Sequence, residues 1–416
     1  MKLRAMLAVG LVTLSAVAGD KEVKLTLSTE QWREDLRTFA KELPRRHKNA
    51  YHAVSKEAFE KAVADLDAAI PTLEPHQVVV RLQQIAALVG DGHTGVHTPG
   101  VFKRYPLGLY WFGNELRVTG AAKEYAQALG TRVVKIGGTA VDDVQARVTR
   151  SFPSADNENP WYVLATSPAF LTSPETLQTL GVVRDLGPAT FTFVDDAGAS
   201  FDLAIAPVQP AAEKAGPTLR LTSAVKEEPL FRQRMGEPFW FTYLPESQTV
   251  YVAFRSYASL GENAKKLWRF VDTNPVQKLV IDLRQNGGGD YTEGRKHLIE
   301  PIKDRPALNQ KGHLFVVIGR RTFSAALANA THFRKETQAI LVGEPIGERP
   351  HSYSENDEMT LPHSHLVVSY STRFYTFGDE DVPAVMPDQR IDPDWAAFKA
   401  GKDPVMDWIL AQQRER

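Results

Sequence analysis

The sequence contains no cysteine, and this absence excludes several kinds of site at once. Without thiols, the chain forms no disulfides and binds no metal through thiolates. No cysteine follows the amino-terminal apolar run either, which excludes a lipoprotein anchor there. A chain of 416 residues can bury a large core without cross-links, and its length predicts two or three domains.

Long hydrophobic runs and an excess of charge of one sign are also missing. The 49 basic residues nearly balance the 50 acidic ones, so the net charge is close to zero. No basic block interleaved with aromatic residues is present, which argues against nucleic acid as a partner. Beyond the amino terminus, no apolar stretch is long enough to span a membrane. We therefore expect a soluble protein with no membrane span.

The first residues have the pattern of a secretory signal peptide. Lys2 and Arg4 precede an apolar run over residues 5–17, and an Ala-Val-Ala cleavage site follows at residues 16–18. This run is too short for an ordinary transmembrane helix, and the alternative to a signal is a buried or interfacial helix. The pattern predicts a cleaved signal peptide over residues 1–18 and an exported protein, periplasmic or secreted.

Residues 19–90 have the spacing of amphipathic helices. Ser28 and Gln31 form the sequence pattern of a capping box, and apolar residues recur at helical spacing after it. Two further helical stretches follow, at residues 55–69 and 75–88. We expect a helical subdomain or lid in this part of the chain.

Residues 101–207 differ from the helical region, because short alternating runs indicate small β-strands. The segment 131–141 has the pattern of a strand, a glycine turn and then a strand or helix. Residues 207–217 are rich in alanine and proline and are typical of a linker.

From about residue 236 the sequence alternates between strands and helices. This alternation predicts an α/β core with mostly parallel strands. Ligands of such sheets bind beyond the carboxyl ends of the strands. The expected strands are residues 249–255, 279–283, 314–319, 339–343 and 366–371, and helices at 262–273, 292–302 and 324–335 separate the first four.

Two of these strand ends carry residues suited to acyl transfer. Three consecutive glycines, 287–289, follow one strand and expose backbone N–H groups that suit an anion or a developing oxyanion. Ser324 follows the next strand and opens a helix, where the Ala325 N–H and the helix dipole favour negative charge. The alternative is an N-cap serine without chemistry.

A serine nucleophile needs a base, and His93 in the segment Asp91-Gly92-His93-Thr94 is the best candidate. The alternative is a surface or structural histidine. His97 lies four residues further on, so the two histidines could form a metal-binding pair on a helix. Gly95 and Pro99 argue against the helix that such a pair needs. The acidic run 379–381 is either a solvated face or the source of a residue that orients the base.

Five motifs follow one another along the chain: DGHT at 91–94, IDLRQNGGG at 281–289, TFSAA at 322–326, GEPIG at 343–347 and MPD at 386–388. Together, and in this order, they resemble the tail-specific protease family of serine peptidases. That family includes the carboxyl-terminal processing proteases, the tricorn core protease and the repeats of interphotoreceptor retinoid-binding protein. The resemblance implies a ClpP/crotonase-like catalytic core over 236–416 with 91–98, a PDZ-like β-rich module over 101–207 and a helical subdomain over 19–90.

The chain departs from one branch of that family. Carboxyl-terminal processing proteases use a serine–lysine dyad, but the corresponding loop here, 344–349, has no lysine. Arg349 cannot lose its proton and so cannot be the base. The resemblance therefore implies the tricorn branch, with His93 as the base, although Gly92 stands where tricorn proteases have a serine. Their assisting glutamate corresponds to Asp381, with Glu380 beside it.

The sequence thus predicts an exported serine peptidase that acts on a peptide or protein without a cofactor or a metal. Ser324 is the expected nucleophile and His93 the general base, with Asp381 or Glu380 orienting it. The expected oxyanion donors are the N–H groups of Gly287 or Gly288 and of Ala325. Two alternatives stay open, namely a serine esterase with the same machinery and a catalytically silent ligand-binding protein.

Overall fold

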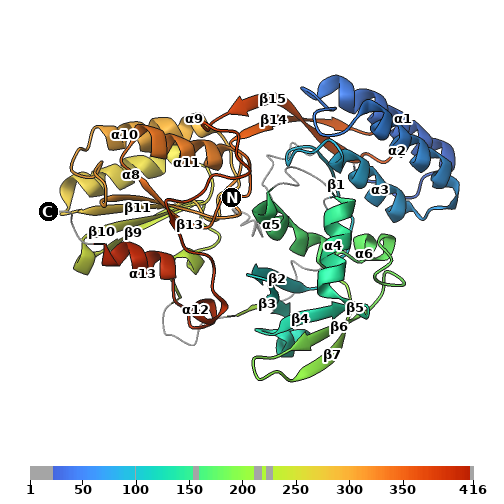
Figure 1. Cartoon of the computed structure of the whole chain (residues 1–416), viewed down its shortest axis with the longest axis horizontal. Coiled ribbons are helices and arrows are strands. Elements are labelled where there is room, and N and C mark those ends of the chain that lie inside the picture. Colours follow the sequence, from blue (N-terminus) through green and yellow to red (C-terminus); the bar gives the residue numbers. More distant parts are fainter. Residues whose placement is uncertain (1–21, 99, 153–158, 210–217, 222–227, 413–416) are drawn as a thin grey trace, which may run out of the picture. The chain divides into compact units, whose positions relative to one another are not determined.

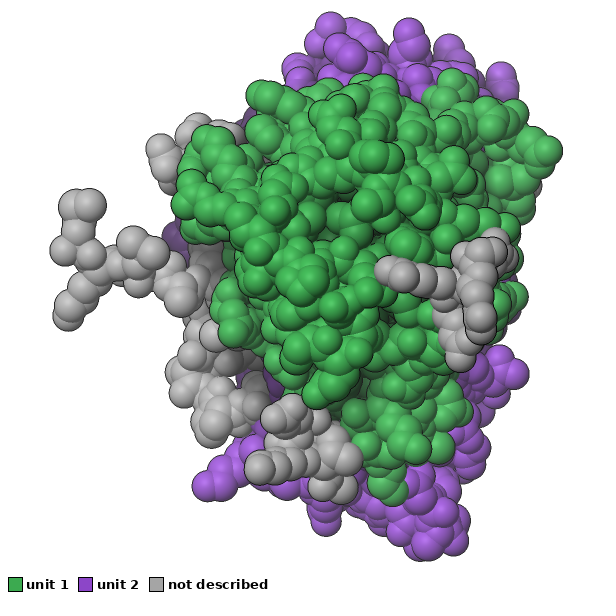
Figure 2. All heavy atoms as spheres, turned by 90° about the vertical axis from the view of Figure 1, so that its left-hand side faces the viewer, with its two compact units in different colours: residues 1–16, 222–351, 376–416 green, residues 17–221, 352–375 purple. Residues whose placement is uncertain are grey.

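The computed structural model describes residues 22–98, 100–152, 159–209, 218–221 and 228–412. The predicted signal peptide and the larger part of the predicted linker lie outside these ranges. The described residues form two compact units, which Figure 2 shows in different colours. Residues 228–351 and 376–412 make up the first unit, and residues 22–221 and 352–375 make up the second. None of the described helices is both long and apolar enough to cross a membrane.

A six-stranded sheet forms the centre of the first unit. Its strand order is β16-β13-β12-β11-β10-β9. All neighbouring strands are parallel except β9, which pairs antiparallel with β10. The predicted α/β core with mostly parallel pairing is therefore confirmed for four of the five expected strands. The fifth, 366–371, was wrongly assigned to it: these residues lie in the second unit, where they pair antiparallel with residues 95–97. The strands are β9 (Phe239–Leu244), β10 (Thr249–Phe254), β11 (Lys278–Asp282), β12 (Leu314–Ile318), β13 (Ile340–Gly343) and β16 (Gln389–Arg390).

Helices cover both faces of this sheet (Figure 1). Alternate strand residues such as Val252 and Ile281 pack against one helical layer, and their neighbours such as Val280 pack against α13. Because both faces are buried, the strands have nearly continuous apolar sequences. The first layer comprises α8 (Leu260–Thr273), α9 (Tyr291–Gly294), η5 (Arg295–Ile299), α10 (Glu300–Lys303) and α11 (Ala325–Glu336); η3 (Leu230–Arg232), η4 (Pro245–Ser247), α12 (Trp395–Lys399) and α13 (Pro404–Ala411) complete the unit.

The second unit contains the predicted helices. The capping box of Ser28 and Gln31 is present at the start of α1 and confirms the predicted helix boundary. A core that includes Phe39, Leu82 and Val368 joins these helices to a small sheet of order β1-β15-β14. The elements are α1 (Thr29–Arg46), α2 (Lys56–Ala69), η1 (Ile70–Thr72), α3 (Pro75–Ala87), β1 (Gly95–His97), β14 (His351–Thr360) and β15 (Val367–Thr376).

A larger sheet of the second unit contains the strands predicted between residues 101 and 207. Its order is β2-β3-β4-β6-β7, with β5 on β4 and β8 on β3. The segment 131–141 forms a strand, a glycine turn, a short strand and a helix start, as predicted. The elements are β2 (Leu107–Phe112), β3 (Glu115–Ala122), η2 (Lys123–Ala128), β4 (Arg132–Ile136), β5 (Thr139–Ala140), α4 (Val141–Ser151), α5 (Pro160–Leu171), α6 (Pro174–Thr179), β6 (Ala189–Val194), β7 (Ser200–Ile205) and β8 (Thr218–Arg220).

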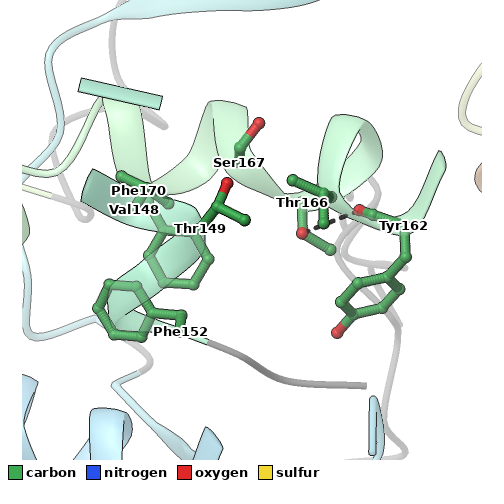
Figure 3. A pocket seen from close by; sticks show the side chains of 8 residues that line it. Val148, Thr149, Phe152, Tyr162, Thr166, Ser167 and Phe170 are labelled. Carbon is green, nitrogen blue, oxygen red and sulfur yellow. Dashed lines mark hydrogen bonds between the residues drawn. The ribbon is translucent and has the colours of Figure 1, made fainter. Parts of the chain in front are cut away.

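A small pocket lies between α4 and α5 (Figure 3). Its cavity volume of about 10 Å³ is room for one water molecule. The lining is mostly apolar, and the Thr166 hydroxyl is already bonded to the Tyr162 carbonyl at 3.0 Å. This pocket is too small to receive a peptide side chain.

Contacts group residues 91–98 differently from the predicted domain boundaries. We predicted that residues 91–98 belong to the catalytic core of residues 236–416, whereas the structure groups them with the second unit. The reason is pairing over a long sequence separation, because Gly95–His97 forms an antiparallel ladder with β15.

Candidate active site

Ser324 lies in the turn between β12 and α11, in a backbone conformation that is rare for a residue with a Cβ atom. Its φ is 56° and its ψ is −123°. It occupies the N-cap position of α11, but its side chain makes no capping hydrogen bond. The side chain is half-buried. The structure therefore gives Ser324 the position of an N-cap serine without the bond that such a residue makes.

Backbone and side-chain hydrogen bonds tie this turn to the end of β11. The Phe323 N–H donates to the Asn286 carbonyl at 3.1 Å. The Thr322 hydroxyl donates to the Leu283 carbonyl at 2.9 Å and accepts from the Gly319 N–H at 3.1 Å. The turn that carries Ser324 is therefore held directly against the chain that leads into the glycine triplet.

The glycine triplet contacts Ser324. Gly288 has a φ of 111°, and a Cβ built on it would lie 2.7 Å from the Ser324 Cβ. Gly289 has a φ of 151°, and its Cβ would lie 2.6 Å from the Tyr257 ring. A side chain at either position would clash, so glycine is required for both conformation and space.

The Asn286 side chain occupies one of the backbone N–H groups of this loop. Its side chain is buried, donates to the Phe254 carbonyl and accepts from the Gly288 N–H, each at 3.0 Å. Among the residues that the structure describes, the N–H groups of Gly287 and Ala325 have no hydrogen-bond partner. Of the three predicted oxyanion donors, these two therefore have N–H groups that remain available, whereas that of Gly288 is occupied.

A buried ion-pair cluster lies where β11 ends. The Arg284 guanidinium bonds the carboxylates of Asp282 and Asp403, at 2.7 Å each. Burial by itself lowers the pKa of Arg284, but the two carboxylates hold it well above its usual range. Tyr251 adds a hydrogen bond to Asp282 at 2.7 Å. The cluster links the residues before the glycine triplet to the first turn of α13.

His93 is buried in the second unit. Its Nε2 lies 3.1 Å from the Ser354 Oγ, and the ring also shares a hydrogen bond with the Tyr353 backbone. Burial lowers the pKa of His93 to about 4, although the charge of Asp91 and the bond with Tyr353 act in the opposite direction. The imidazole is therefore neutral at neutral pH, which is the state that a general base needs.

The Asp91 carboxylate fixes the loop that carries His93. One oxygen accepts the His93 N–H at 3.0 Å and the Ser371 hydroxyl at 2.8 Å. The other accepts from His47 at 2.8 Å and from the Thr94 hydroxyl at 2.9 Å. Burial by itself raises the pKa of Asp91, but the hydrogen bond from His47 and the nearby histidines bring it below its usual range.

The tautomer of His47 follows from its second contact. The Asn49 N–H donates to the Nδ1 of His47 at 2.9 Å, so this nitrogen is an acceptor without a proton. The proton therefore lies on Nε2, which donates to Asp91. His47 thus donates to a buried carboxylate through Nε2, and its other ring nitrogen accepts from the Asn49 N–H.

His97 does not form the helical metal pair that its spacing from His93 suggested. It lies in strand β1, and its Nε2 is 2.8 Å from the Ser369 Oγ. Within the described residues, no group of three or more potential ligands among histidine and acidic residues could hold a metal ion.

The two predicted acids lie in the first unit, whereas His93 lies in the second. Asp381 bonds the Arg349 guanidinium at 2.7 Å, which lowers the pKa of that carboxyl, and its side chain is 61% exposed. The Glu380 side chain is exposed and makes no hydrogen bond or ion pair within the described part of the chain.

Two side chains that contact the predicted catalytic residues were not predicted from the sequence. Ser354 contacts His93, and Glu348 accepts the backbone N–H of Ser324. The loop 344–349 offered a signal for Glu348, because the resemblance had already singled out this loop by its lack of a lysine. Ser354 lies in a polar strand without apolar alternation, so no comparable signal marks its position.

The fold is similar to that of mature CPAF. The structure of mature CPAF in complex with lactacystin superposes on this chain with a TM-score of 0.59 and 10% sequence identity. The match covers 92% of this chain and 97% of that chain. A CPAF point mutant has a TM-score of 0.60 and 12% identity, over 93% of this chain and 99% of the other.

The tricorn protease has a TM-score of 0.43 and 14% identity, over 92% of this chain and 36% of that one. No protein-family model matches the chain, and no curated protein matches it significantly. At 10% to 12% identity, the similarity to CPAF establishes the fold.

Proposed function

We propose that this chain is a serine-type peptidase of the tail-specific kind. Ser324 attacks the scissile carbonyl, and His93 takes its proton and later returns it to the leaving amine. The N–H groups of Gly287 and Ala325 stabilise the tetrahedral oxyanion. Gly288 is the less suitable donor, because its N–H is already bonded to Asn286. The mechanism uses no metal or cofactor.

The contact between Ser324 and the glycine triplet is the observation that carries this proposal. Ser324 has a sparsely populated backbone conformation, its hydroxyl does not cap the helix, and Gly288 lies against it. Residues in such conformations concentrate at functional sites. Removing one oxyanion donor from a site of this type costs about 3 kcal/mol of transition-state stabilisation.

The assignment of His93 requires the two units to present it to Ser324 in the active enzyme. Its buried, neutral imidazole and the Asp91 carboxylate behind its loop favour this role. Asp381 or Glu380 would orient the imidazole, as the family resemblance implies. The separate variants Asp381→Asn and Glu380→Gln decide between them, because only the orienting acid lowers kcat when it loses its charge.

A fluorophosphonate probe tests the proposed nucleophile directly. We expect stoichiometric labelling of Ser324, no labelling of the Ser324→Ala variant and slower labelling of His93→Ala. Mass spectrometry of a digested peptide library then identifies the cleaved bonds, and a matched panel of esters separates a peptidase from an esterase. A folded protein that neither labels nor cleaves any peptide would refute the proposal and favour the silent binding protein.

We further infer the finer architecture and the cellular location. The first unit, with helices on both faces of a parallel sheet, fits a ClpP/crotonase-like core, and the sheet of β2 to β7 with α4 fits a PDZ-like module. The signal pattern of residues 1–18 supports export. Amino-terminal sequencing of the protein from its native host tests this, since export predicts a mature chain that begins at residue 19.

A further inference from the structure

We propose that Glu348 is a positioning residue that holds Ser324 in its reactive conformation. This inference rests on the proposed function, because it concerns the same nucleophile. The backbone N–H of Ser324 donates a hydrogen bond to the Glu348 carboxylate. The Glu348 residue is 3% exposed, so water does not compete freely for this bond.

The loop that carries Glu348 is fixed at its start against the turn of Ser324. Gly343 has a φ of 122°, and a Cβ on it would lie 2.4 Å from the Ile318 carbonyl. The Glu344 N–H donates to that carbonyl at 3.2 Å, and its side chain forms a buried ion pair with Arg320. The end of β13 therefore lies directly beside the end of β12, where the serine turn begins.

The same loop is fixed again before it reaches Glu348. The Ile346 N–H donates to the Val385 carbonyl at 3.1 Å, and the Ile346 side chain is buried in the main core of the unit. Glu348 thus projects from a constrained loop rather than from a solvated one. A carboxylate placed in this way can select one orientation of the peptide group that it binds.

The bond to Ser324 is of a kind that can hold a strained residue. A hydrogen bond from a backbone N–H to a carboxylate is roughly twice as strong as one between neutral groups. The carboxylate also lies at the N-terminal end of α11, where the helix dipole favours negative charge. The bond compensates the unfavourable φ of Ser324 and keeps its N–H directed away from the oxyanion, for which Gly287 and Ala325 remain.

A role in proton transfer is the competing explanation, since relatives carry a basic lysine in this loop. The contact in the structure favours positioning, because Glu348 binds the N–H of Ser324. The Ser324 hydroxyl makes no hydrogen bond to Glu348 among the described contacts. The two explanations differ in what a neutral side chain of the same shape would do.

The variants Glu348→Ala and Glu348→Gln test this difference in the full-length protein. Glutamine keeps an oxygen that accepts the Ser324 N–H, whereas alanine removes the acceptor. Glu336→Gln is the matched control, because Glu336 is an ion-paired carboxylate at the other end of α11. Each variant is compared with the wild type by its fluorophosphonate labelling rate, kcat, KM, pH profile and melting temperature.

We expect Glu348→Ala to lower the labelling rate and kcat by roughly 100-fold, with KM nearly unchanged, because a small displacement of a nucleophile has an effect of this size. Glu348→Gln should retain activity within about tenfold, since a neutral acceptor makes a weaker bond than a carboxylate. Its pH profile should keep the wild-type shape. Glu336→Gln should label at the wild-type rate.

Three outcomes overturn the inference. If Glu348→Gln folds but is as inactive as Glu348→Ala, the charge or the proton of Glu348 is what matters. If Glu348→Ala labels as fast as the wild type, the bond has no role in positioning. If the wild type does not label at all, the proposed function itself fails, and this inference fails with it.

Discussion

Gly288 lies against Ser324 so closely that a Cβ on the glycine would stand 2.7 Å from the Cβ of the serine. Carbon atoms that are not bonded to each other do not approach to this distance, so the glycine loop and the serine turn fit together only while residue 288 has no side chain. The shape of the candidate site is therefore set by packing as well as by hydrogen bonds.

The first prediction follows from this contact. Gly288→Ala should lower the fluorophosphonate labelling rate of Ser324 by about 100-fold, because the new methyl group displaces the nucleophile. It should also lower the free energy of unfolding by about 1–3 kcal/mol, since the φ of 111° is unfavourable for alanine. Labelling of the intact protein and urea unfolding measure the two effects.

Gly236→Ala is the matched control for this variant. A Cβ on Gly236 would meet no atom within 4 Å, and its φ lies outside the left-handed region. We expect this change to leave labelling unchanged. A Gly288→Ala protein that labels at the wild-type rate would contradict the proposed contact between the glycine triplet and the nucleophile.

The second prediction concerns the Asp91 carboxylate. In Asp91→Asn, the new NH₂ group replaces an oxygen that accepts two of the four hydrogen bonds, so at least one bond is lost inside the protein. We expect the free energy of unfolding to fall by about 2 kcal/mol, the cost of leaving a buried polar group unsatisfied. Urea unfolding measures this change.

The activity of Asp91→Asn should fall together with its stability, because the backbone N–H of His93 is one of the four donors that the Asp91 carboxylate binds. Ser371→Ala serves as the comparison, since it removes a single donor and leaves the carboxylate intact; we expect about 1 kcal/mol for it. An Asp91→Asn protein as stable and as active as the wild type would show that this network has no part in holding the His93 loop.

Local patterns in the sequence predicted much of the fold. The capping box at Ser28, the strands β10 to β13 and the position of Ser324 after β12 each depend on a few consecutive residues. Their periodicity and their caps are local properties, so a single sequence carries them. The glycine triplet was identified in the same way, because three adjacent glycines mark a place where the backbone itself is exposed.

The rest depends on contacts between distant residues, which a single sequence does not show. His47 and Asp91 are 44 positions apart, and the ladder between β1 and β15 joins residues 270 to 274 positions apart. Strand β14 is polar, so no apolar alternation marks it. The domain boundary around residues 91–98 differed from the prediction for this reason. Only the fold brings these groups together.

The third prediction concerns the buried ion-pair cluster of the first unit. Arg284→Met leaves the carboxylates of Asp282 and Asp403 facing each other without their cation. Breaking a buried pair in this way should lower the free energy of unfolding by about 3–5 kcal/mol. The double variant Arg284→Met with Asp403→Asn should recover part of this loss, because one of the two charges is gone.

Arg390→Met is the control for this experiment. Arg390 pairs with Asp392 at the surface, where the two side chains are 50% and 48% exposed. Such a pair contributes less than about 1 kcal/mol, so its loss should change little. Equal unfolding free energies for Arg284→Met and Arg390→Met would show that the buried cluster does not stabilise the end of β11.

The fourth prediction is the pH dependence that His93 causes. Burial lowers the pKa of His93 to about 4 from an ordinary value of 6.5. Below pH 6.5 the unfolded chain therefore binds a proton at this residue before the folded protein does. Stability is lost as the pH falls from 6.5 to 4, and 2.5 pKa units correspond to about 3 kcal/mol.

Urea unfolding of the wild type and of His93→Asn at pH 7, 6, 5 and 4 isolates this contribution. We expect the difference between the unfolding free energies of the two proteins to shrink by about 3 kcal/mol from pH 7 to pH 4, because the variant has no imidazole to protonate. Since the base is neutral above pH 4, labelling of Ser324 should persist well below pH 6.5. A labelling rate that halves near pH 6.5 would show that the catalytic histidine is solvated, and it would remove His93 as the base.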